Sequence, residues 1–333
     1  MTRLGYALSS EEHAPVDLVR NAVQAEAVGF SFALISDHFH PWIDRQGQSP
    51  FVWSVLGAIA QATSRLEIGT GVTCPTVRTH PAIIAQAAAT TTTLMPGRFF
   101  LGVGTGENLN EHIFGDPWPE WEVRAEMLEE AVEIIRELWR GEVTSYRGDY
   151  YTVQNARLYT LPEEPPPIHV AAGGPRMAGV AARIGDGLIG TGPERELLDA
   201  FDAGGGTGPR YGQITLCWAK SEAEARRTAL EWWPNAAIRG EASQELPSPA
   251  HFGQLAEMVT EDSIAESVLC GPDAEPLLER IRTYTDAGYD HIYLHQVGPD
   301  QAGFFDFVQG EVLSEFEAAI AGDEAPGSRL RSK

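Results

Sequence analysis

One stretch decides the fold: Phe32-Ala33-Leu34-Ile35-Ser36-Asp37-His38-Phe39-His40-Pro41-Trp42. Residues 32–35 form a short apolar run, which is typical of a strand buried on both faces. The run then breaks into acidic, imidazole and indole side chains, which are costly to bury unless they face a cavity. In a parallel α/β protein that cavity lies at the carboxyl ends of the strands. We therefore expect a catalytic edge here, with His38 as its working group.

Outside this stretch, strand-like and helix-like segments alternate along the chain, which is the pattern of βα units around a parallel sheet. The expected strands are 4–8, 32–35, 66–70, 98–103, 168–171, 187–190, 214–219 and 290–295, and the expected helices include 15–28, 51–63, 81–94, 120–139 and 175–184. Eight such units predict a (β/α)8 TIM barrel. A doubly wound sheet would also alternate, but Ala7-Leu8-Ser9-Ser10 stands where its glycine-rich fingerprint would follow the first strand.

Two insertions and a tail complete the expected organisation of a single domain over 1–320. A hairpin is predicted at 143–153, where Gly148-Asp149 lies between Thr- and Tyr-rich arms. The irregular region 231–262 is interpreted as a lid at the barrel mouth. The small, charged residues of 321–333 predict a disordered tail.

Composition excludes several classes of partner. The 333 residues include 43% hydrophobic residues, and their net charge of −23 disfavours binding to nucleic acid or to an anionic membrane. No apolar run reaches the roughly 18 residues of a membrane helix. Three widely spaced cysteines indicate no disulfide framework, and the first residues are typical of a strand rather than of a signal peptide. We expect a cytoplasmic protein that acts on a small-molecule substrate.

Candidate site residues follow the expected strands at the end where barrel enzymes work. These stretches are Asp37-His38, 71–76, 104–111, 172–174, Thr191-Gly192 and His295. Among them His38 is the best acid–base candidate, because only imidazole titrates near neutrality when unperturbed; a structural, buried histidine is the alternative. Asp37 should point the other way along the extended chain, as a structural or ligand-binding acceptor. His38-Phe39-His40 could also ligate a metal, but only His295 is well placed to complete such a site, so none is expected.

Two glycine-rich turns suggest ligand contacts. Glu107 lies in a turn whose glycines allow close approach to a ligand, and its carboxyl group could exchange a proton if burial raises its pKa. The alternative is a carboxylate that only favours the start of a helix. Gly173-Gly174-Pro175, before a helix, has the pattern of a phosphate cradle, although an ordinary tight turn would look the same.

Taken together, these motifs resemble those of one family. They are Ser36-Asp37-His38-Phe39-x-Pro41-Trp42, Pro75-Thr76 with Pro81 to Gln86, Gly102 to Glu111, Gly148-Asp149-Tyr150-Tyr151 and Ala171-Ala172-Gly173-Gly174-Pro175. From Leu4 to Thr191, and again from Asp273 to His295, the chain resembles the F420-dependent glucose-6-phosphate dehydrogenases of the luciferase-like barrel superfamily. The resemblance implies that coenzyme F420, a deazaflavin, lies in the barrel mouth, and it favours a homodimer.

The resemblance also implies residue roles. His38 would take the substrate hydroxyl proton while hydride passes to C5 of the deazaflavin, Glu107 would protonate the N1 side of the ring, and Trp42 would stabilise the charged intermediate. A cis peptide at Gly71-Val72 would form a bulge behind the ring. The implied cofactor-binding residues are Asp37, Gly71, Val72, Thr73, Gly104, Thr105, Gly106, Asn110, Ala171, Ala172, Gly173, Gly174 and Thr191.

The chain departs from the family in the expected substrate pocket, which would include Glu194, Arg280 and His295. Members that act on sugar phosphates bind the phosphate with two Lys and one Arg; Arg280 matches the Arg, Glu194 replaces one Lys, and 240–244 contains no Lys. A carboxylate beside a phosphate is unfavourable. We therefore predict hydride transfer with an alcohol, hemiacetal or related carbonyl substrate other than glucose 6-phosphate. The alternatives are a reduced-FMN monooxygenase, an F420H2-dependent reductase, and a barrel that binds a ligand without converting it.

Overall fold

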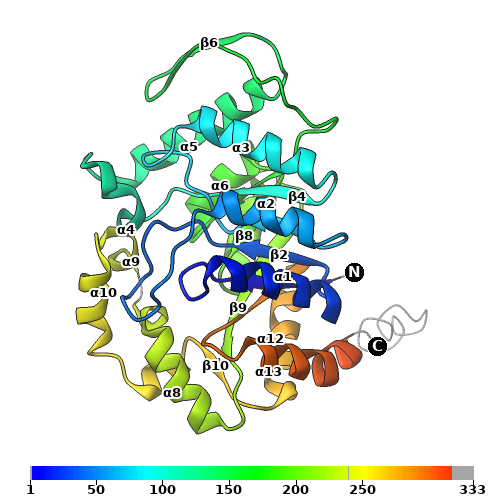
Figure 1. Ribbon diagram of the computed structural model, residues 1–333. Helices are drawn as coiled ribbons and strands as arrows, with labels where there is room; N and C mark the ends of the chain where they lie inside the picture. Colours follow the sequence, from blue (N-terminus) through cyan, green and yellow to red (C-terminus); the bar gives the residue numbers. More distant parts are fainter. Residues whose placement is uncertain (1, 239, 317–333) are drawn as a thin grey trace, which may run out of the picture.

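Eight parallel strands close into a barrel in the computed structural model, which describes residues 2–238 and 240–316 (Figure 1). The strands are β1 (Arg3–Leu8), β2 (Phe32–Ile35), β3 (Glu67–Thr70), β4 (Phe99–Val103), β7 (Ile168–Ala171), β8 (Gly187–Gly190), β9 (Arg210–Cys217) and β11 (His291–Gln296). Each strand pairs with the next in this order, and β11 pairs with β1 to close the ring. The predicted TIM barrel is confirmed.

The strand β9 differs most from its predicted bounds. It begins at Arg210 rather than at Ile214, because its pairing with β11 runs from Tyr211 opposite His291 to Leu216 opposite Gln296. Hydrogen bonding to β11 therefore extends β9 to include residues 210–213, whose side chains are too polar to predict a buried strand. The two-residue strand β10 (Leu269–Cys270) pairs with the end of β9 outside the barrel.

Helices cover the outside of the barrel, and their starts follow from the sequence. The covering helices are α1 (Pro15–Val28), α2 (Val52–Ala62), α3 (Pro81–Leu94), α5 (Trp121–Leu138), α6 (Pro175–Ile184), α7 (Arg195–Ala203), α8 (Glu222–Trp232), α12 (Ala274–Ala287) and α13 (Gln301–Phe307). Proline at the first position of α1, α3 and α6 presets the backbone for a helix and needs no N–H partner. No helix among the described residues is both long and apolar enough to cross a membrane.

Large side chains fill the lower part of the barrel interior. Phe32, Phe100, Tyr211 and Tyr293 are all buried there and pack on one another. Because this layer occupies the barrel interior, open space is left only at the carboxyl ends of the strands.

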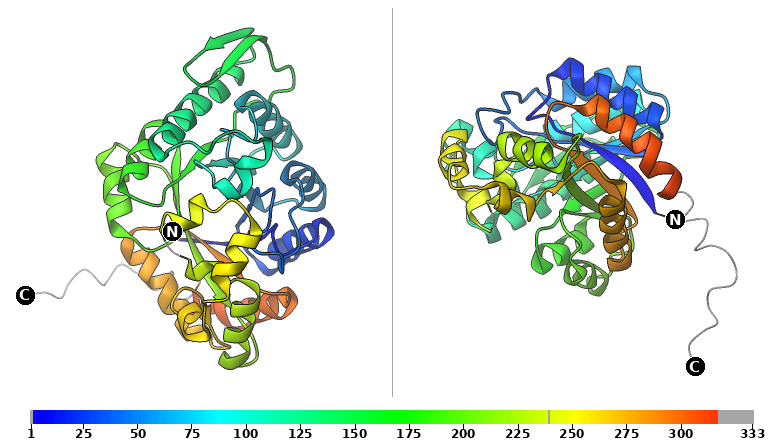
Figure 2. Two further views of the ribbon diagram at one scale, coloured as in Figure 1. Left: turned by 90° about the vertical axis from the view of Figure 1, so that its left-hand side faces the viewer. Right: turned by 90° about the horizontal axis from the view of Figure 1, so that it is seen from below.

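The two predicted insertions lie at different places. β5 (Thr144–Arg147) and β6 (Thr152–Ala156) form the predicted hairpin, which extends three residues further than expected and projects beyond α5 (Figure 1). The region predicted to be irregular contains η2 (Pro234–Ala237), α9 (Ala242–Glu245), α10 (Pro249–Ala256) and α11 (Glu261–Ala265). Its first part, drawn in yellow, lies across the open end of the barrel (Figure 2, left). The tail predicted to be disordered, 321–333, lies outside the described residues.

Candidate active site

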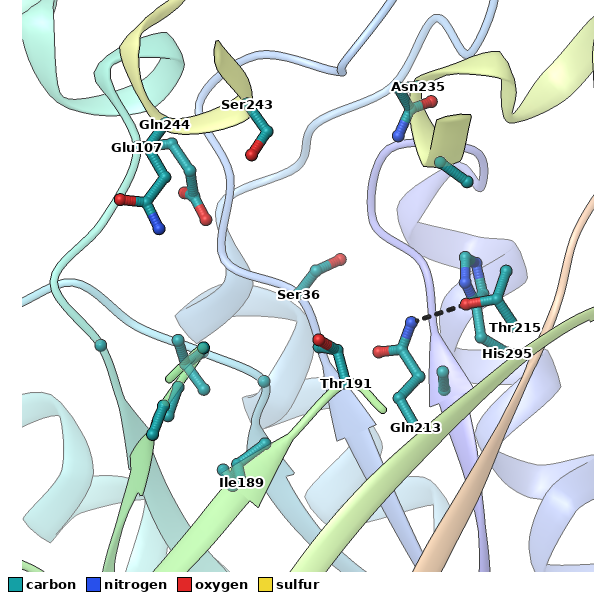
Figure 3. A pocket seen from close by; sticks show the side chains of 18 of the residues that line it. Ser36, Glu107, Ile189, Thr191, Gln213, Thr215, Asn235, Ser243, Gln244 and His295 are labelled. Carbon is teal, nitrogen blue, oxygen red and sulfur yellow. Dashed lines mark hydrogen bonds between the residues drawn. The ribbon is translucent and has the colours of Figure 1, made fainter. Parts of the chain in front are cut away.

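A cavity of about 1050 Å³ opens at the carboxyl end of the barrel. Segments that follow β1, β2, β3, β4, β7 and β8 line one part of it, and β9, β11 and the insertion around η2 and α9 line the rest (Figure 3). The structure therefore brings the stretches selected from the sequence together on one face. It also places His38, Trp42 and Glu107 in the wall of the same cavity.

His38 is held so that one ring nitrogen is free to act as a base. Its Nδ1 lies 3.2 Å from the carbonyl oxygen of His40 and 3.4 Å from Oε1 of Glu11. A carbonyl and a carboxylate can only accept hydrogen bonds, so Nδ1 carries the proton of the neutral ring and Nε2 keeps a lone pair. The Trp42 ring lies 5.0 Å from the imidazole, between centroids, and can stabilise a positive charge there.

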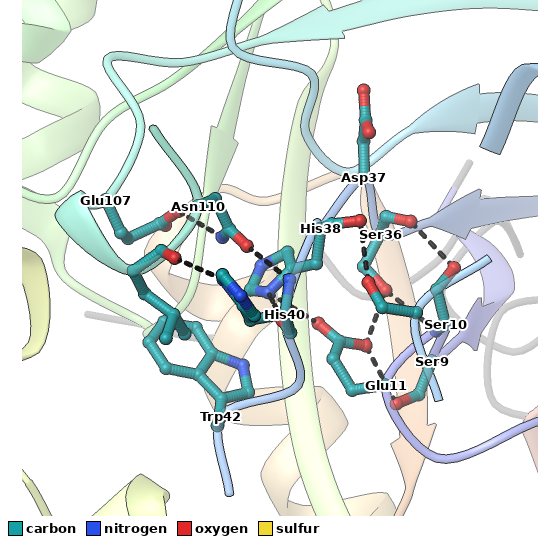
Figure 4. Close-up of polar contacts among 12 residues, drawn as sticks. Ser9, Ser10, Glu11, Ser36, Asp37, His38, His40, Trp42, Glu107 and Asn110 are labelled. Atoms are coloured by element: carbon teal, nitrogen blue, oxygen red, sulfur yellow. Dashed lines mark hydrogen bonds and ion pairs between the residues drawn. The ribbon is translucent and has the colours of Figure 1, made fainter. Parts of the chain in front are cut away.

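Glu11 is a site residue that the sequence reasoning missed. Its side chain is only 3% exposed and accepts hydrogen bonds from the hydroxyl groups of Ser36 (2.6 Å) and Ser9 (3.1 Å) (Figure 4). Burial opposes ionisation, but His38 and the Ser36 hydroxyl outweigh it and hold the pKa of Glu11 below its usual value. The available signal is the polar stretch 9–13 directly after the first strand, at the end of the barrel where sites lie.

Glu107 lies at the start of the short helix α4 (Asn108–Glu111), and its carboxylate does not cap that helix. The carboxylate lines the cavity and lies 3.5 Å from Nδ2 of Asn110 (Figure 4). Asn110, predicted to bind the cofactor, does not line the cavity. Its Oδ1 instead accepts hydrogen bonds from the backbone N–H groups of Phe39 and His40. Asn110 thus joins the segment that carries His38 to the segment that carries Glu107.

A second connection between these segments runs through Arg78, a residue that no sequence motif singled out. Arg78 donates to Asp37 Oδ1 at 3.0 Å and to Glu111 through its backbone N–H at 2.7 Å. Thr73 also donates to the Asp37 carboxylate, so the structure places Asp37 and Thr73 beneath the cavity wall rather than in it. Burial raises the pKa of Glu111 to about 7 despite the neighbouring Arg78.

Close-packed backbone forms the floor of the cavity beside Glu107. The peptide bond Gly71-Val72 is cis, as the resemblance implied, and both residues line the cavity. Gly104 lies against this bulge, where a Cβ would come within 2.7 Å of Val72 Cγ2, so a larger residue would displace the floor. Gly106, next to the lining residue Thr105, has a φ of 78°, which favours glycine. A flat ring can approach such a surface closely.

The start of α6 can hold an anion. Gly174 is the N-cap of this ten-residue helix and makes no side-chain cap. A Cβ at Gly173 or Gly174 would meet nothing within 4 Å, so these glycines border open space rather than packed side chains. Ala171, Ala172, Thr191 and Arg176 line the cavity nearby. The N–H groups and positive end of the helix start favour a negatively charged ligand, as does the guanidinium group of Arg176, which also pairs with Glu122 at 3.0 Å.

The rest of the cavity lining is polar but poor in cations. Figure 3 shows Gln213, Thr215, Asn235 and His295 on one side, and Ser243 and Gln244 near Glu107 on the other. Glu194 lines the cavity, whereas Arg280 lies exposed on α12 outside the lining. Among the described lining residues, no lysine occurs and Arg176 is the single arginine. This part of the lining therefore lacks the positive charge that a phosphate group needs.

The geometry does not bring the two imidazoles of His38-Phe39-His40 together on one ligand. Nδ1 of His40 contacts the Leu109 carbonyl at 2.8 Å, and its ring stacks on His112. The described residues include no cluster of three or more potential metal-ligating side chains.

Comparison with known proteins identifies relatives of this arrangement. A profile of the luciferase-like monooxygenase family matches residues 1–291. Proteins named F420-dependent glucose-6-phosphate dehydrogenase are 39% identical in Intrasporangium calvum, over 94% of this chain and 98% of the relative, and 36% identical in Tsukamurella paurometabola, over 95% and 98%.

Solved structures with a similar fold include proteins that depend on F420. An F420-dependent secondary alcohol dehydrogenase in complex with an F420-acetone adduct matches with a TM-score of 0.86 and 31% identity, over 93% of this chain and 98% of that one. The coenzyme F420 dependent tetrahydromethanopterin reductase from Methanopyrus kandleri shares the fold, with a TM-score of 0.77 and 22% identity over 95% and 99%. The chain therefore belongs to the luciferase-like monooxygenase family and groups with relatives named F420-dependent glucose-6-phosphate dehydrogenase.

Proposed function

We propose that this chain is an F420-dependent oxidoreductase that oxidises a neutral hydroxyl-bearing substrate or reduces the corresponding carbonyl. The observation that carries the proposal is His38, whose Nδ1 is held by two acceptors while its ring lines the cavity that also contains Glu107 and the glycine floor. Relatives at 31–39% identity are named for F420, which supports the same cofactor here.

The residues present fit this cofactor. The bulge at Gly71-Val72 and the bare Gly104 form a floor for a flat ring, and the start of α6 with Arg176 offers an anion site for a charged tail. When bound, F420 supplies C5 as the hydride acceptor or donor. Of the residues that the resemblance assigned to the cofactor, Asp37, Thr73 and Asn110 act in this proposal by holding the surrounding loops.

In the oxidative direction the proton and the hydride leave the substrate separately. The C–H bond of the reacting carbon breaks and its electron pair leaves with the hydride. Nε2 of His38 accepts the proton of the hydroxyl group on the same carbon, and Glu11 stabilises the imidazolium that forms. With F420 bound, the Glu107 carboxyl group would supply a proton at N1 of the ring, which would balance the charge that the hydride adds. Reduction uses the same residues in reverse.

We propose that the substrate carries no charge at the end that would be a phosphate group in glucose 6-phosphate. Glu194 lines this part of the cavity, Ser243 and Gln244 are neutral, and Arg280 lies outside the lining. Two like charges about 4 Å apart near a protein surface repel by about 4 kcal/mol, so a phosphate beside Glu194 would be disfavoured.

The test combines cofactor titration with turnover. Purified protein should bind F420, seen as a change in deazaflavin fluorescence, and should bleach its absorbance when a neutral alcohol or aldose is added. His38→Ala should bind F420 as the wild type does and lose hydride transfer by about 10²–10⁴-fold. Tight FMN binding with oxygen consumption and no affinity for F420 would support the monooxygenase alternative instead. Binding of F420 without turnover of any such compound would favour a ligand-binding barrel.

We also propose a cytoplasmic homodimer. Val16 and Val23 on α1, Phe51 before α2 and Ile83 on α3 expose apolar side chains, and these helices pack side by side, which supports a self-association surface. Three free thiols support a reducing compartment. Light scattering coupled to size-exclusion chromatography tests the dimer, because a monomer mass at micromolar concentration would contradict it.

A further inference from the structure

A second histidine in the cavity wall is held in the same way as His38, and the reaction described above does not use it. His295 on β11 lines the cavity although its side chain is only 4% exposed. Its Nε2 lies 3.4 Å from Oε2 of Glu12, whose side chain is 1% exposed. The other oxygen of Glu12 accepts the backbone N–H of Gly298 at 2.9 Å. A buried carboxylate thus fixes the orientation of this imidazole.

The hydrogen-bonding capacity of His295 is directed into the cavity. Because the Glu12 carboxylate only accepts, Nε2 carries the proton of the neutral ring and Nδ1 keeps a lone pair. Nδ1 has no hydrogen-bond partner among the described residues, and it is not one of their buried unpaired polar atoms. The ring edge packs against Trp233, with centroids 4.5 Å apart. A polar atom that faces a cavity on a ring fixed by two neighbours is suited to bind a ligand.

The two histidines are arranged around one turn. Glu11 and Glu12 are consecutive residues after β1, and β1 lies between β2, which leads to His38, and β11, which carries His295. Adjacent strands are about 4.8 Å apart, so β2 and β11 lie roughly 10 Å apart on either side of β1. Each histidine contacts a glutamate of the turn that follows β1. His295 also helps to lower the pKa of Glu11, more weakly than His38 does. Both imidazoles therefore face one small region.

We propose that His295, oriented by Glu12, binds a second oxygen of the substrate, on a carbon next to the one that reacts at His38. The inference rests on the proposed function and adds a substrate class to it: compounds with hydroxyl groups on neighbouring carbons, in preference to alcohols with a single oxygen. The neutral side chains of Gln213, Thr215 and Asn235 on the same wall can bind further hydroxyl groups (Figure 3). In this arrangement Nδ1 of His295 accepts the proton of the neighbouring hydroxyl group.

The test compares two substrates that differ by one oxygen. D-Glucose carries a hydroxyl group beside its reacting hemiacetal carbon, and 2-deoxy-D-glucose lacks it. With F420, wild-type protein should show a kcat/KM about tenfold higher for D-glucose, because the deoxy compound leaves a polar site unpaired. His295→Phe keeps a ring against Trp233 but removes the hydrogen-bond acceptor. The ratio of kcat/KM for D-glucose to kcat/KM for 2-deoxy-D-glucose should therefore fall to about one in this variant, through loss of activity on D-glucose alone. His295→Asn restores a polar atom near Nδ1 and should give an intermediate ratio.

Two further variants separate binding from packing. Glu12→Gln should lower the ratio partly, because it weakens the orientation of the ring without removing it. His13→Phe is the matched control: it removes a buried imidazole beside the same glutamate that does not line the cavity, and its ratio should equal that of the wild type. If His295→Phe does not fold, the ratios measured for His295→Asn and Glu12→Gln test the role of His295 instead.

The results that would refute the role of His295 differ from those that would refute the proposed function. A wild-type ratio near one, with clear turnover of both sugars, would refute the role of His295 and leave the proposed oxidoreductase intact. So would a tenfold ratio that persists in His295→Phe, or in His295→Asn and Glu12→Gln together. Absence of F420 reduction with both sugars and with 1,2-propanediol would overturn the inference, and failure to bind F420 at all would overturn the proposed function with it.

Discussion

The substitution Glu11→Gln tests whether a buried carboxylate activates His38. Gln keeps the shape of the side chain and can still accept the Ser36 hydroxyl, which donates to Glu11 at 2.6 Å. It removes the negative charge that lies 3.4 Å from Nδ1 of His38. The imidazolium that forms when His38 accepts a proton would then lack its counterion.

The expected loss of kcat follows from the free energy that this counterion contributes. A hydrogen bond to a charged group contributes about 1.5–3 kcal/mol, and about 1.4 kcal/mol corresponds to a factor of ten in rate. We therefore expect kcat for F420 reduction to fall by about 10–150-fold in Glu11→Gln. The affinity for F420, measured by fluorescence titration, should change little, because the glycine floor and the start of α6 are untouched.

A remote carboxylate provides the control. Glu26 on α1 accepts backbone N–H groups of residues 64–66, and its pKa is also lowered, in part by these hydrogen bonds. Glu26→Gln should leave kcat unchanged. An unchanged kcat in Glu11→Gln would refute the idea that Glu11 supports the base. Loss of F420 binding with normal kcat at saturation would instead make Glu11 a cofactor ligand.

The same variant gives a pH test of stability. Because the pKa of Glu11 in the folded chain lies below its usual value, its ionisation stabilises the fold above the unfolded pKa of about 4.3, and this contribution is lost as the pH falls through the lower folded value. In urea unfolding, Glu11→Gln should be less stable than the wild type at neutral pH, and the difference should shrink in acid. A difference that grows in acid would contradict the direction of this shift.

Three further predictions concern other residues in the cavity wall and behind it. Glu107→Gln cannot supply a proton, so turnover should fall while F420 still binds; unchanged turnover would leave Glu107 only a helix-start role. Glu194→Lys combined with Ser243→Lys should lower KM for glucose 6-phosphate by at least about tenfold, since both cations would attract the phosphate before and during the reaction; a micromolar KM in the wild type would refute the missing phosphate site. Burial raises the pKa of Glu111 to about 7, so the stability from its neutral form, complete below about pH 4.3, is lost as the pH rises to about 7; Glu111→Gln should flatten the stability curve across this range in urea unfolding, and an unchanged slope would contradict it.

Much of the barrel could be predicted from local pattern. A strand buried on both faces needs a continuous apolar run, and a covering helix needs an apolar stripe, so residues 32–35 and 81–94 reveal their conformation without reference to neighbours. The rule that barrel sites lie at the carboxyl ends of strands then placed His38, Glu107 and Gly173 on one face. By contrast, β9 depended on pairing with β11, and its first residues could not be found from periodicity.

The sequence by itself determined the barrel, the face that carries the site and the residue types available there, because these follow from periodicity and chain order. Only the tertiary structure decided which side chains meet. Glu11 contacts His38, Glu12 contacts His295 and Arg78 joins Asp37 to Glu111, and each contact joins residues far apart in the chain. Such contacts depend on strand register and side-chain direction, which closing the barrel sets for all strands at once.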